Sequence, residues 1–254
     1  MLDYLKVEFE DIKPLFELYV SSLSDVYDDF LETHILESQF YTIEYKNELV
    51  GYFAIHEKDL LTQFFVKKEF LHLSQDFFKA VLKEKKVSYA FVPTCDELLL
   101  SLAMDFHKKV QLQAYFFEPT VREVEPANYP KSMLRLANLS DVEMIKKLSG
   151  NFFSDLYQSV SDRKIYILED EVIYGFGIME NNKIHKHCRG IGMYTVEAHR
   201  RNGIGRSIIL HLKDLCETLE YRPLPGCWYH NYNSKKTLES CGFASKTRLL
   251  KVEF

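Results

Sequence analysis

The chain has 254 residues, of which 46% are hydrophobic, and it carries a formal net charge of −5 with a pI near 6. This length favours two domains with ample apolar material for buried cores. The acidic balance lacks the basic footprint of nucleic-acid-binding proteins, and no run of about 18 apolar residues predicts a membrane span.

Cysteine usage and the N-terminus bear on the compartment. The first 20 residues carry acids throughout and lack the apolar core of a signal peptide. The five cysteines form no C-x-x-C pair, which argues against a disulfide framework and against a zinc site. We therefore expect reduced thiols in a cytoplasmic protein that binds no metal, no membrane and no nucleic acid.

In the N-terminal half, three stretches carry strand and helix patterns. Residues 41–55 predict two strands joined at an acidic turn, and residues 61–84 predict a strand followed by a helix. Residues 88–106 predict a further strand and helix. Residues 118–131 contain three prolines and little apolar periodicity, which is typical of a linker. We expect domains at 1–118 and 132–254, with a linker at 119–131.

The C-terminal half repeats the same order of elements. A short strand and a helix capped near Ser140 or Asp141 are predicted within 132–148, and two strands within 164–180. The remaining predictions alternate strand and helix, with strands at 188–196, 226–230 and 244–254 and helices at 205–220 and 233–241. The repeated order predicts that the chain is an internal duplication.

The segment with the clearest chemistry joins a strand to a helix. A strand ends near Val196, Arg200-x-x-Gly203-x-Gly205 follows, and an amphipathic helix begins at once. The start of a helix exposes N–H groups without partners and the positive end of the helix dipole, which together bind anions such as diphosphate. Arg201 and Arg206 add positive charge. A G-x-G pair alone is also compatible with a tight turn that binds nothing, and neither a Rossmann nor a Walker A fingerprint is complete.

This loop resembles the acetyl-CoA pyrophosphate loop of the GNAT superfamily. A second segment, Asn231-x-x-Ser234-x-x-x-Leu238-x-x-x-Gly242-Phe243, resembles that superfamily's N-x-x-[AS]-x-x-x-[YL]-x-x-x-G-F motif. The resemblance covers about 120 residues and implies an α/β (α+β) fold of tandem GNAT-like domains. Each domain would be a mixed, mostly antiparallel sheet flanked by helices.

The resemblance also implies a binding site for acetyl-CoA as co-substrate. The residues that it assigns to this site are Tyr194, Thr195, Val196, Arg200, Arg201, Asn202, Gly203, Ile204, Gly205, Arg206, Asn231 and Ser234. The strand residues would pair with the pantetheine amides, and the loop amides would hold the diphosphate. For Asn231 and Ser234, simple helix capping is the competing interpretation.

The catalytic residues are less clear from the pattern. Many relatives have a Tyr, acting as acid, where this chain has Leu238, so we consider Tyr229 and Tyr232, and less so Cys241, in its place. Glu180 is the first candidate for a base, with His185, His187 and Glu197 as others. Each of these is also compatible with a solvated surface group. Trp228, the only tryptophan, either packs in a core or lines the acceptor pocket.

The N-terminal half lacks the residues of the loop. Aligned on Val66 with Val196, it has Phe70, Leu73 and Gln75 at the places of Arg200, Gly203 and Gly205, with Thr94 for Asn231 and Asp105 for Gly242. We therefore expect one acetyl-CoA site per chain, in the C-terminal half.

The function that the resemblance implies is acyl-CoA-dependent N-acyl transfer, most simply of acetyl to an amine of a small molecule or peptide. The alternative is a regulatory module that binds acetyl-CoA without catalysis. The sequence leaves the acceptor and the oligomeric state open.

Overall fold

The computed structural model describes residues 2–254, which form two compact units. The first comprises Met1–Tyr115 together with Thr247–Phe254, and the second comprises Phe116–Lys246. Strands β7 (Lys109–Pro119) and β14 (Phe243–Glu253) each cross from one unit to the other along the chain. The predicted domain 132–254 contains the whole last strand, whereas residues Thr247–Phe254 of that strand belong to the first compact unit. The domain boundaries at 1–118 and 132–254 therefore stay a prediction. None of the helices in residues 2–254 has the length and apolarity of a membrane span.

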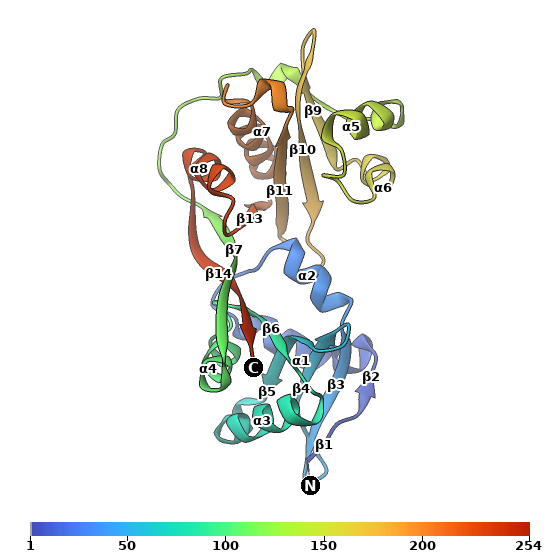
Figure 1. Ribbon diagram of the computed structural model, residues 1–254, viewed down its shortest axis with the longest axis vertical. Coiled ribbons are helices and arrows are strands. Elements are labelled where there is room, and N and C mark those ends of the chain that lie inside the picture. The colour runs from blue at the N-terminus through green and yellow to red at the C-terminus, as the bar shows by residue number, and fades with distance from the viewer. Residues whose placement is uncertain (1) are drawn as a thin grey trace. The chain divides into compact units, whose positions relative to one another are not determined.

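The N-terminal unit is a mixed sheet with helices on both faces (Figure 1). Its strands follow the order β1-β3-β4-β5-β6-β14, in which only β5 and β6 pair in parallel. The elements are β1 (Leu2–Asp3), β2 (Lys6–Val7), α1 (Phe9–Ser22), α2 (Asp29–Leu36), β3 (Gln39–Tyr45), β4 (Glu48–His56), β5 (Leu60–Val66), η1 (Lys68–Leu73), α3 (Ser74–Glu84), β6 (Tyr89–Pro93) and α4 (Glu97–Phe106). The sequence patterns missed α1 and α2.

The C-terminal unit contains a second mixed sheet with the order β12-β11-β10-β9-β8, antiparallel except for β11 and β12. Its elements are η2 (Lys131–Met133), β8 (Leu134–Leu136), η3 (Leu139–Asp141), α5 (Val142–Ser149), α6 (Leu156–Ser161), β9 (Ile165–Glu169), β10 (Ile173–Asn181), β11 (Cys188–Thr195), η4 (Glu197–His199), α7 (Ile204–Thr218), β12 (Arg222–Leu224), β13 (Gly226–Trp228) and α8 (Tyr232–Ser240). The expected mixed, mostly antiparallel sheets with flanking helices are confirmed.

Helices cover both faces of this second sheet (Figure 1). Phe176 points to the face where α5 and α6 close a core around Ile145 and Val160. Its neighbour Gly177 points to the opposite face, where a Cβ atom would come within 2.8 Å of Ile208 on α7. Because side chains alternate along a strand, Gly175 lies on the same face as Gly177, and the two glycines let α7 pack directly on the sheet.

The parallel strands of this sheet separate soon after they begin. β11 pairs with β12 only from Cys188 to Gly190, while its pairing with β10 continues to Thr195. After β12 the chain enters β13, which pairs with the end of β7 and not with β11. There the N–H of Phe117 donates to the carbonyl of Pro225 at 3.2 Å. The outer edge of β11 is therefore open over its last residues.

Candidate active site

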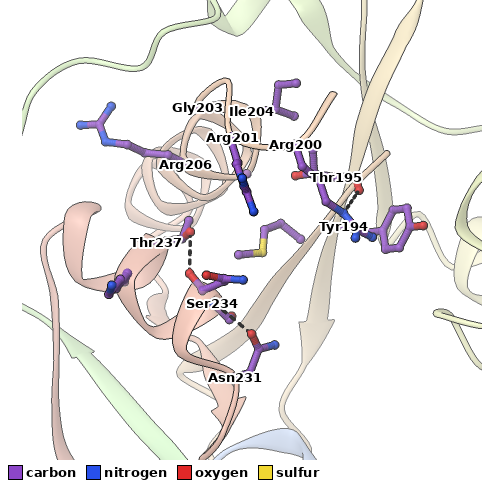
Figure 2. A pocket seen from close by; sticks show the side chains of 14 residues that line it. Tyr194, Thr195, Arg200, Arg201, Gly203, Ile204, Arg206, Asn231, Ser234 and Thr237 are labelled. Carbon is purple, nitrogen blue, oxygen red and sulfur yellow. Dashed lines mark hydrogen bonds between the residues drawn. The ribbon is translucent and has the colours of Figure 1, made fainter. Parts of the chain in front are cut away.

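A cavity of about 650 Å³ lies in the C-terminal unit where β11, the first turn of α7 and the first turns of α8 meet (Figure 2). Its lining consists of Met193, Tyr194, Thr195, Arg200, Arg201, Gly203, Ile204, Gly205, Arg206, Asn231, Asn233, Ser234, Lys236 and Thr237. Ten of the twelve residues expected at the site are in this lining, and the other two, Val196 and Asn202, are not.

The turn before α7 has the geometry of an anion site. Arg201 and Gly203 both have left-handed backbone angles, with φ of 68° and 79°. Gly203 is the N-cap of α7, and no side chain caps the helix. The N–H groups of the first helical turn therefore lack intrahelical acceptors, and left-handed residues in a turn of this kind gather successive N–H groups into a concave nest. This arrangement suits a diphosphate.

The two glycines of the loop serve different purposes. A Cβ atom on Gly205 would lie 3.2 Å from the Thr195 hydroxyl and 3.5 Å from Met193 Cγ, both in the cavity lining. A Cβ atom on Gly203 would instead meet the side chain of Asn128 at 2.9 Å. Gly205 therefore keeps space open in the cavity. Gly203 is required by its positive φ and by the neighbouring chain segment.

The arginines of the loop point in different directions. In Figure 2 the Arg201 side chain extends into the space between α7 and α8, whereas Arg206 extends away from it. The guanidinium of Arg206 donates to the carbonyl of Pro126 at 2.6 Å and also to that of Glu125. These bonds hold the Arg206 side chain against residues 125–126, and its backbone N–H lies in the first turn, so a phosphate contact from Arg206 stays a prediction.

The end of β11 presents alternate residues to the cavity. The N–H of Val196 donates to the carbonyl of Tyr174 at 3.0 Å, which commits Val196 to the sheet. Because backbone groups of successive residues point to opposite edges of a strand, Tyr194 also faces β10, and Met193 and Thr195 face the open edge. The residues whose backbone groups face the open edge are thus Met193 and Thr195. The predicted set of Tyr194, Thr195 and Val196 included only the second of these.

Across the cavity, Asn231 begins α8. Its Oδ1 accepts from the N–H of Ser234 at 3.1 Å, so the capping interpretation holds (Figure 2). Asn231 and Ser234 both line the cavity as well, so capping and ligand contact are compatible. The cavity also includes Asn233, Lys236 and Thr237, which follow Asn231 on the exposed side of a short helix. The sequence analysis did not name these three residues, and the only feature of the sequence that could have indicated them is that they are polar residues in the first turns of a helix.

The N-terminal unit has a corresponding strand-to-helix turn, between β5 and α3. The N–H of Lys67 donates to the carbonyl of Val50 at 2.8 Å, as that of Val196 does to Tyr174, so Lys67 rather than Val66 corresponds to Val196. The strand alignment was wrong by one residue, because the loop of the second unit is one residue longer. The two helix N-caps, Leu73 and Gly203, still correspond as expected.

Side chains occupy the place of the cradle in this unit. Leu73 and Phe70 pack against its hydrophobic core. Gln75, at the place of Gly205, donates to the carboxylate of Asp105 at 2.8 Å. Asp96, which caps α4 through the N–H of Leu99 at 2.9 Å, is the structural counterpart of Asn231 in place of the aligned Thr94.

Two family models match the chain, one in each half. A model described as an acetyltransferase (GNAT) domain matches residues 8–120, and the acetyltransferase (GNAT) family model matches residues 133–243. The chain carries two GNAT acetyltransferase domains. No curated protein matches the sequence.

Solved structures share the tandem GNAT fold at low sequence identity. A GNAT-family acetyltransferase from Colwellia psychrerythraea superposes with a TM-score of 0.89 at 16% identity, covering 99% of both chains. A GCN5-related N-acetyltransferase from Sphaerobacter thermophilus gives 0.67 at 9% identity, over all of this chain and 95% of the other. A tandem GNAT protein of clavulanic acid biosynthesis gives 0.61 at 10% identity, over 99% and 98%. At these identities the likeness establishes the fold alone.

The catalytic candidates of the GNAT domain lie outside the cavity lining. Glu180 forms an ion pair with Lys164 at 2.9 Å, five residues along β10 from Gly175, which pairs with Thr195. Tyr232 is 58% exposed at the start of α8, and Tyr229 is half-buried with its ring 5.3 Å from that of His230. Their roles in acid–base catalysis stay predictions.

Several other candidates have structural roles. Leu238 is buried on α8, and Cys241 is buried with its thiol 3.5 Å from the carbonyl of Arg206. Burial raises the pKa of Cys241 to about 11, which keeps the thiol protonated. Trp228 is 58% exposed and contacts the ring of His230 at 4.9 Å, so the core-packing interpretation was wrong.

The remaining candidates are exposed or lie in turns. Glu197 forms a long ion pair with Arg200 at 3.6 Å. His185 and His187 lie in the turn before β11 with ring centroids 6.3 Å apart. Within residues 2–254, no three of the His, Cys, Asp and Glu side chains gather closely enough to hold a metal ion.

Proposed function

We propose that the protein is an acetyl-CoA-dependent N-acetyltransferase that acts on an amine of a small molecule or a peptide. The observation that carries the proposal is the uncapped N-terminus of α7, with left-handed Arg201 and Gly203, opening on the same cavity as the free edge of β11. This pairing of an anion site with an extended strand edge against which no other strand lies fits a ligand that has a diphosphate and an amide-containing arm.

The residues present fit such a ligand in three places. The N–H groups of 201–206 would hold the diphosphate, with the Arg201 side chain adding charge. The outward N–H and carbonyl groups of Met193 and Thr195 would pair with the two amides of the pantetheine arm, as an edge strand pairs with a peptide. Asn231, on the opposite wall, would contact the same arm.

In the proposed reaction the unprotonated amine nitrogen attacks the carbonyl carbon of the thioester. A C–N bond forms, the C–S bond breaks, and the electron pair of that bond leaves with the CoA sulfur. Both N–H groups face the open edge of β11, and the one that the arm leaves free, of Met193 or of Thr195, would stabilise the charge that develops on the carbonyl oxygen. One proton leaves the amine, and one is taken up by the thiolate.

The proton route has no carboxylate or imidazole in the described cavity lining. Tyr194, the one phenol there, donates to the carbonyl of Leu148 at 3.1 Å. We therefore assign proton transfer to water, with Glu180 on β10 as its candidate acceptor. Tyr229 and Tyr232, which flank Asn231 in the sequence, are its candidate donors. Exposed Trp228, which ends β13 three residues before Asn231, would line the acceptor side.

The compartment belongs to the same proposal. All five cysteines are buried thiols, and none forms a disulfide within residues 2–254, which favours the reducing cytoplasm as the place of action.

The test is release of CoA thiol from acetyl-CoA in the presence of a panel of amines, together with direct titration of acetyl-CoA. Amine-dependent release and mass-spectrometric detection of the acetylated amine support the enzyme. Binding without release for any amine would instead support the alternative, a regulatory module that binds acetyl-CoA. The absence of binding would contradict both.

A further inference from the structure

The segment Thr120–Lys131, predicted as a linker, lies against the C-terminal unit; we call it the strap. At its start, the N–H and hydroxyl of Thr120 both donate to the carbonyl of Gly242, at 2.8 and 2.9 Å. At its end, Lys131 forms an ion pair with Asp214 of α7. The strap therefore follows α7 and is held at both ends within one unit.

The central part of the strap contacts the first turn of α7. The guanidinium of Arg206 donates to the carbonyls of Glu125 and Pro126. At the next residue of α7, the hydroxyl of Ser207 accepts from the N–H of Tyr129 at 3.2 Å. The ring of His211 contacts the carbonyl of Tyr129 at 2.7 Å. All of these contacts are to backbone atoms of the strap, so they depend on the path of the strap backbone more than on the side chains of the strap.

The strap also reaches the left-handed turn itself. The Asn128 side chain occupies the space that a Cβ atom of Gly203 would enter, at 2.9 Å. Gly203 is the N-cap of α7, and its left-handed angle directs the following N–H groups towards the cavity. The strap thus backs the cradle at Gly203, the residue whose left-handed angle shapes the turn.

We propose that the strap is a structural part of the acetyl-CoA site and that Arg206 is a positioning residue, which fixes the nest of N–H groups without touching phosphate. The physical reason is that a nest binds an anion tightly only when its N–H groups are already oriented, since ordering them on binding costs free energy. The proposal rests on the proposed function. A direct phosphate contact by Arg206 is the competing role, and it requires both carbonyl bonds to the strap to break.

The test compares three single substitutions in the full chain, each of which removes one positive charge. Arg206→Met breaks the strap contacts, Arg201→Met removes the arginine that extends into the cavity, and Lys147→Met on the exposed surface of α5 is the matched control. Acetyl-CoA affinity is titrated at several salt concentrations. Backbone amide exchange is measured on the free proteins.

For Arg206→Met we expect acetyl-CoA affinity about tenfold weaker than that of the wild type, because the variant loses the hydrogen bonds that the charged guanidinium donates to the strap. The salt dependence of its affinity should equal that of the wild type. Amides of 201–206 should exchange faster in this variant even without ligand. Arg201→Met should weaken affinity and flatten the salt dependence, and Lys147→Met should change neither.

A flattened salt dependence for Arg206→Met, equal to that of Arg201→Met, would overturn the positioning role in favour of direct contact. Unchanged affinity or unchanged exchange at 201–206 would also overturn it. If the wild type fails to bind acetyl-CoA at all, the proposed function is lost, while the exchange measurement still decides whether the strap orders the turn.

Discussion

At the scale of single residues, Asn231 illustrates how one side chain serves stability and binding together. Its Oδ1 caps α8, and the residue also lines the cavity. Asn231→Ala should lower the free energy of unfolding by about 1 kcal/mol, as for other N-caps, and weaken acetyl-CoA binding. Asn231→Ser should restore the cap without restoring affinity. If Ser restores both thermal stability and the titrated affinity, Asn231 is only a cap.

A second prediction at this scale concerns Asp96, a buried carboxylate. Burial raises its pKa to about 7, partly offset by the hydrogen bond from Leu99. In the unfolded chain this carboxyl has its ordinary pKa, so between about pH 4 and pH 7 the folded protein binds more protons. Stability should therefore fall as the pH rises through this window, by up to about 1.4 kcal/mol per pH unit.

Asp96→Asn keeps the helix cap and removes this titration. We expect the variant to be more stable than the wild type at pH 8, and the gap to close towards pH 4, in denaturant titrations at each pH. Asp28, the buried cap of α2, has a pKa raised to about 8 for the same reason, so part of the decline should persist in the variant. A gap that is the same at both pH values would contradict the assignment.

At the scale of elements, the packing of α7 on β10 determines where the cradle lies. A Cβ atom on Gly177 would come within 2.8 Å of Ile208 and 3.0 Å of Leu212. Gly177→Ala should therefore lower the free energy of unfolding by about 1–3 kcal/mol, through overpacking. Equal thermal stabilities for wild type and Gly177→Ala would contradict this packing.

Much of this element structure could be predicted from the chain. Glycines and an arginine at fixed spacing after an apolar strand predicted the loop, and alternation predicted β9 to β11. What failed was the assignment of individual groups. Arg206 carries the right charge, but its direction depends on the carbonyls of Pro126 and Glu125, which are distant in sequence. Met193 has no polar side chain to mark it, and its role follows only from the register of β11 with β10.

At the scale of the whole molecule, the last strand belongs to two units in turn. Residues Leu249–Glu253 of β14 pair with β6, and Val252 is fully buried in the core of the N-terminal unit. The sequence of β14 reads as one strand and contains no signal for which sheet it joins, so the expected boundary could not include this return. The position of the strand depends on pairing across more than 150 residues.

Val252→Ala should therefore destabilise the N-terminal unit although it changes a C-terminal residue. We expect a loss of roughly 1–3 kcal/mol, from the lost apolar burial and the cavity left behind. Amide exchange should rise in β6 and stay unchanged in β9 and β10. Faster exchange confined to β9 and β10 would contradict the pairing.

The central claim is that one acetyl-CoA binds per chain, at the uncapped N-terminus of α7. The most direct test is calorimetric titration of acetyl-CoA into the wild type and two variants based on the corresponding positions Gly205 and Gln75. Gly205→Gln gives the second unit the residue that the first unit has, which would fill the cavity beside Thr195. Gln75→Ala is the control in the first unit. We predict one site in the wild type, no binding in Gly205→Gln and unchanged binding in Gln75→Ala; two sites per chain, or full affinity in folded Gly205→Gln, would contradict the account.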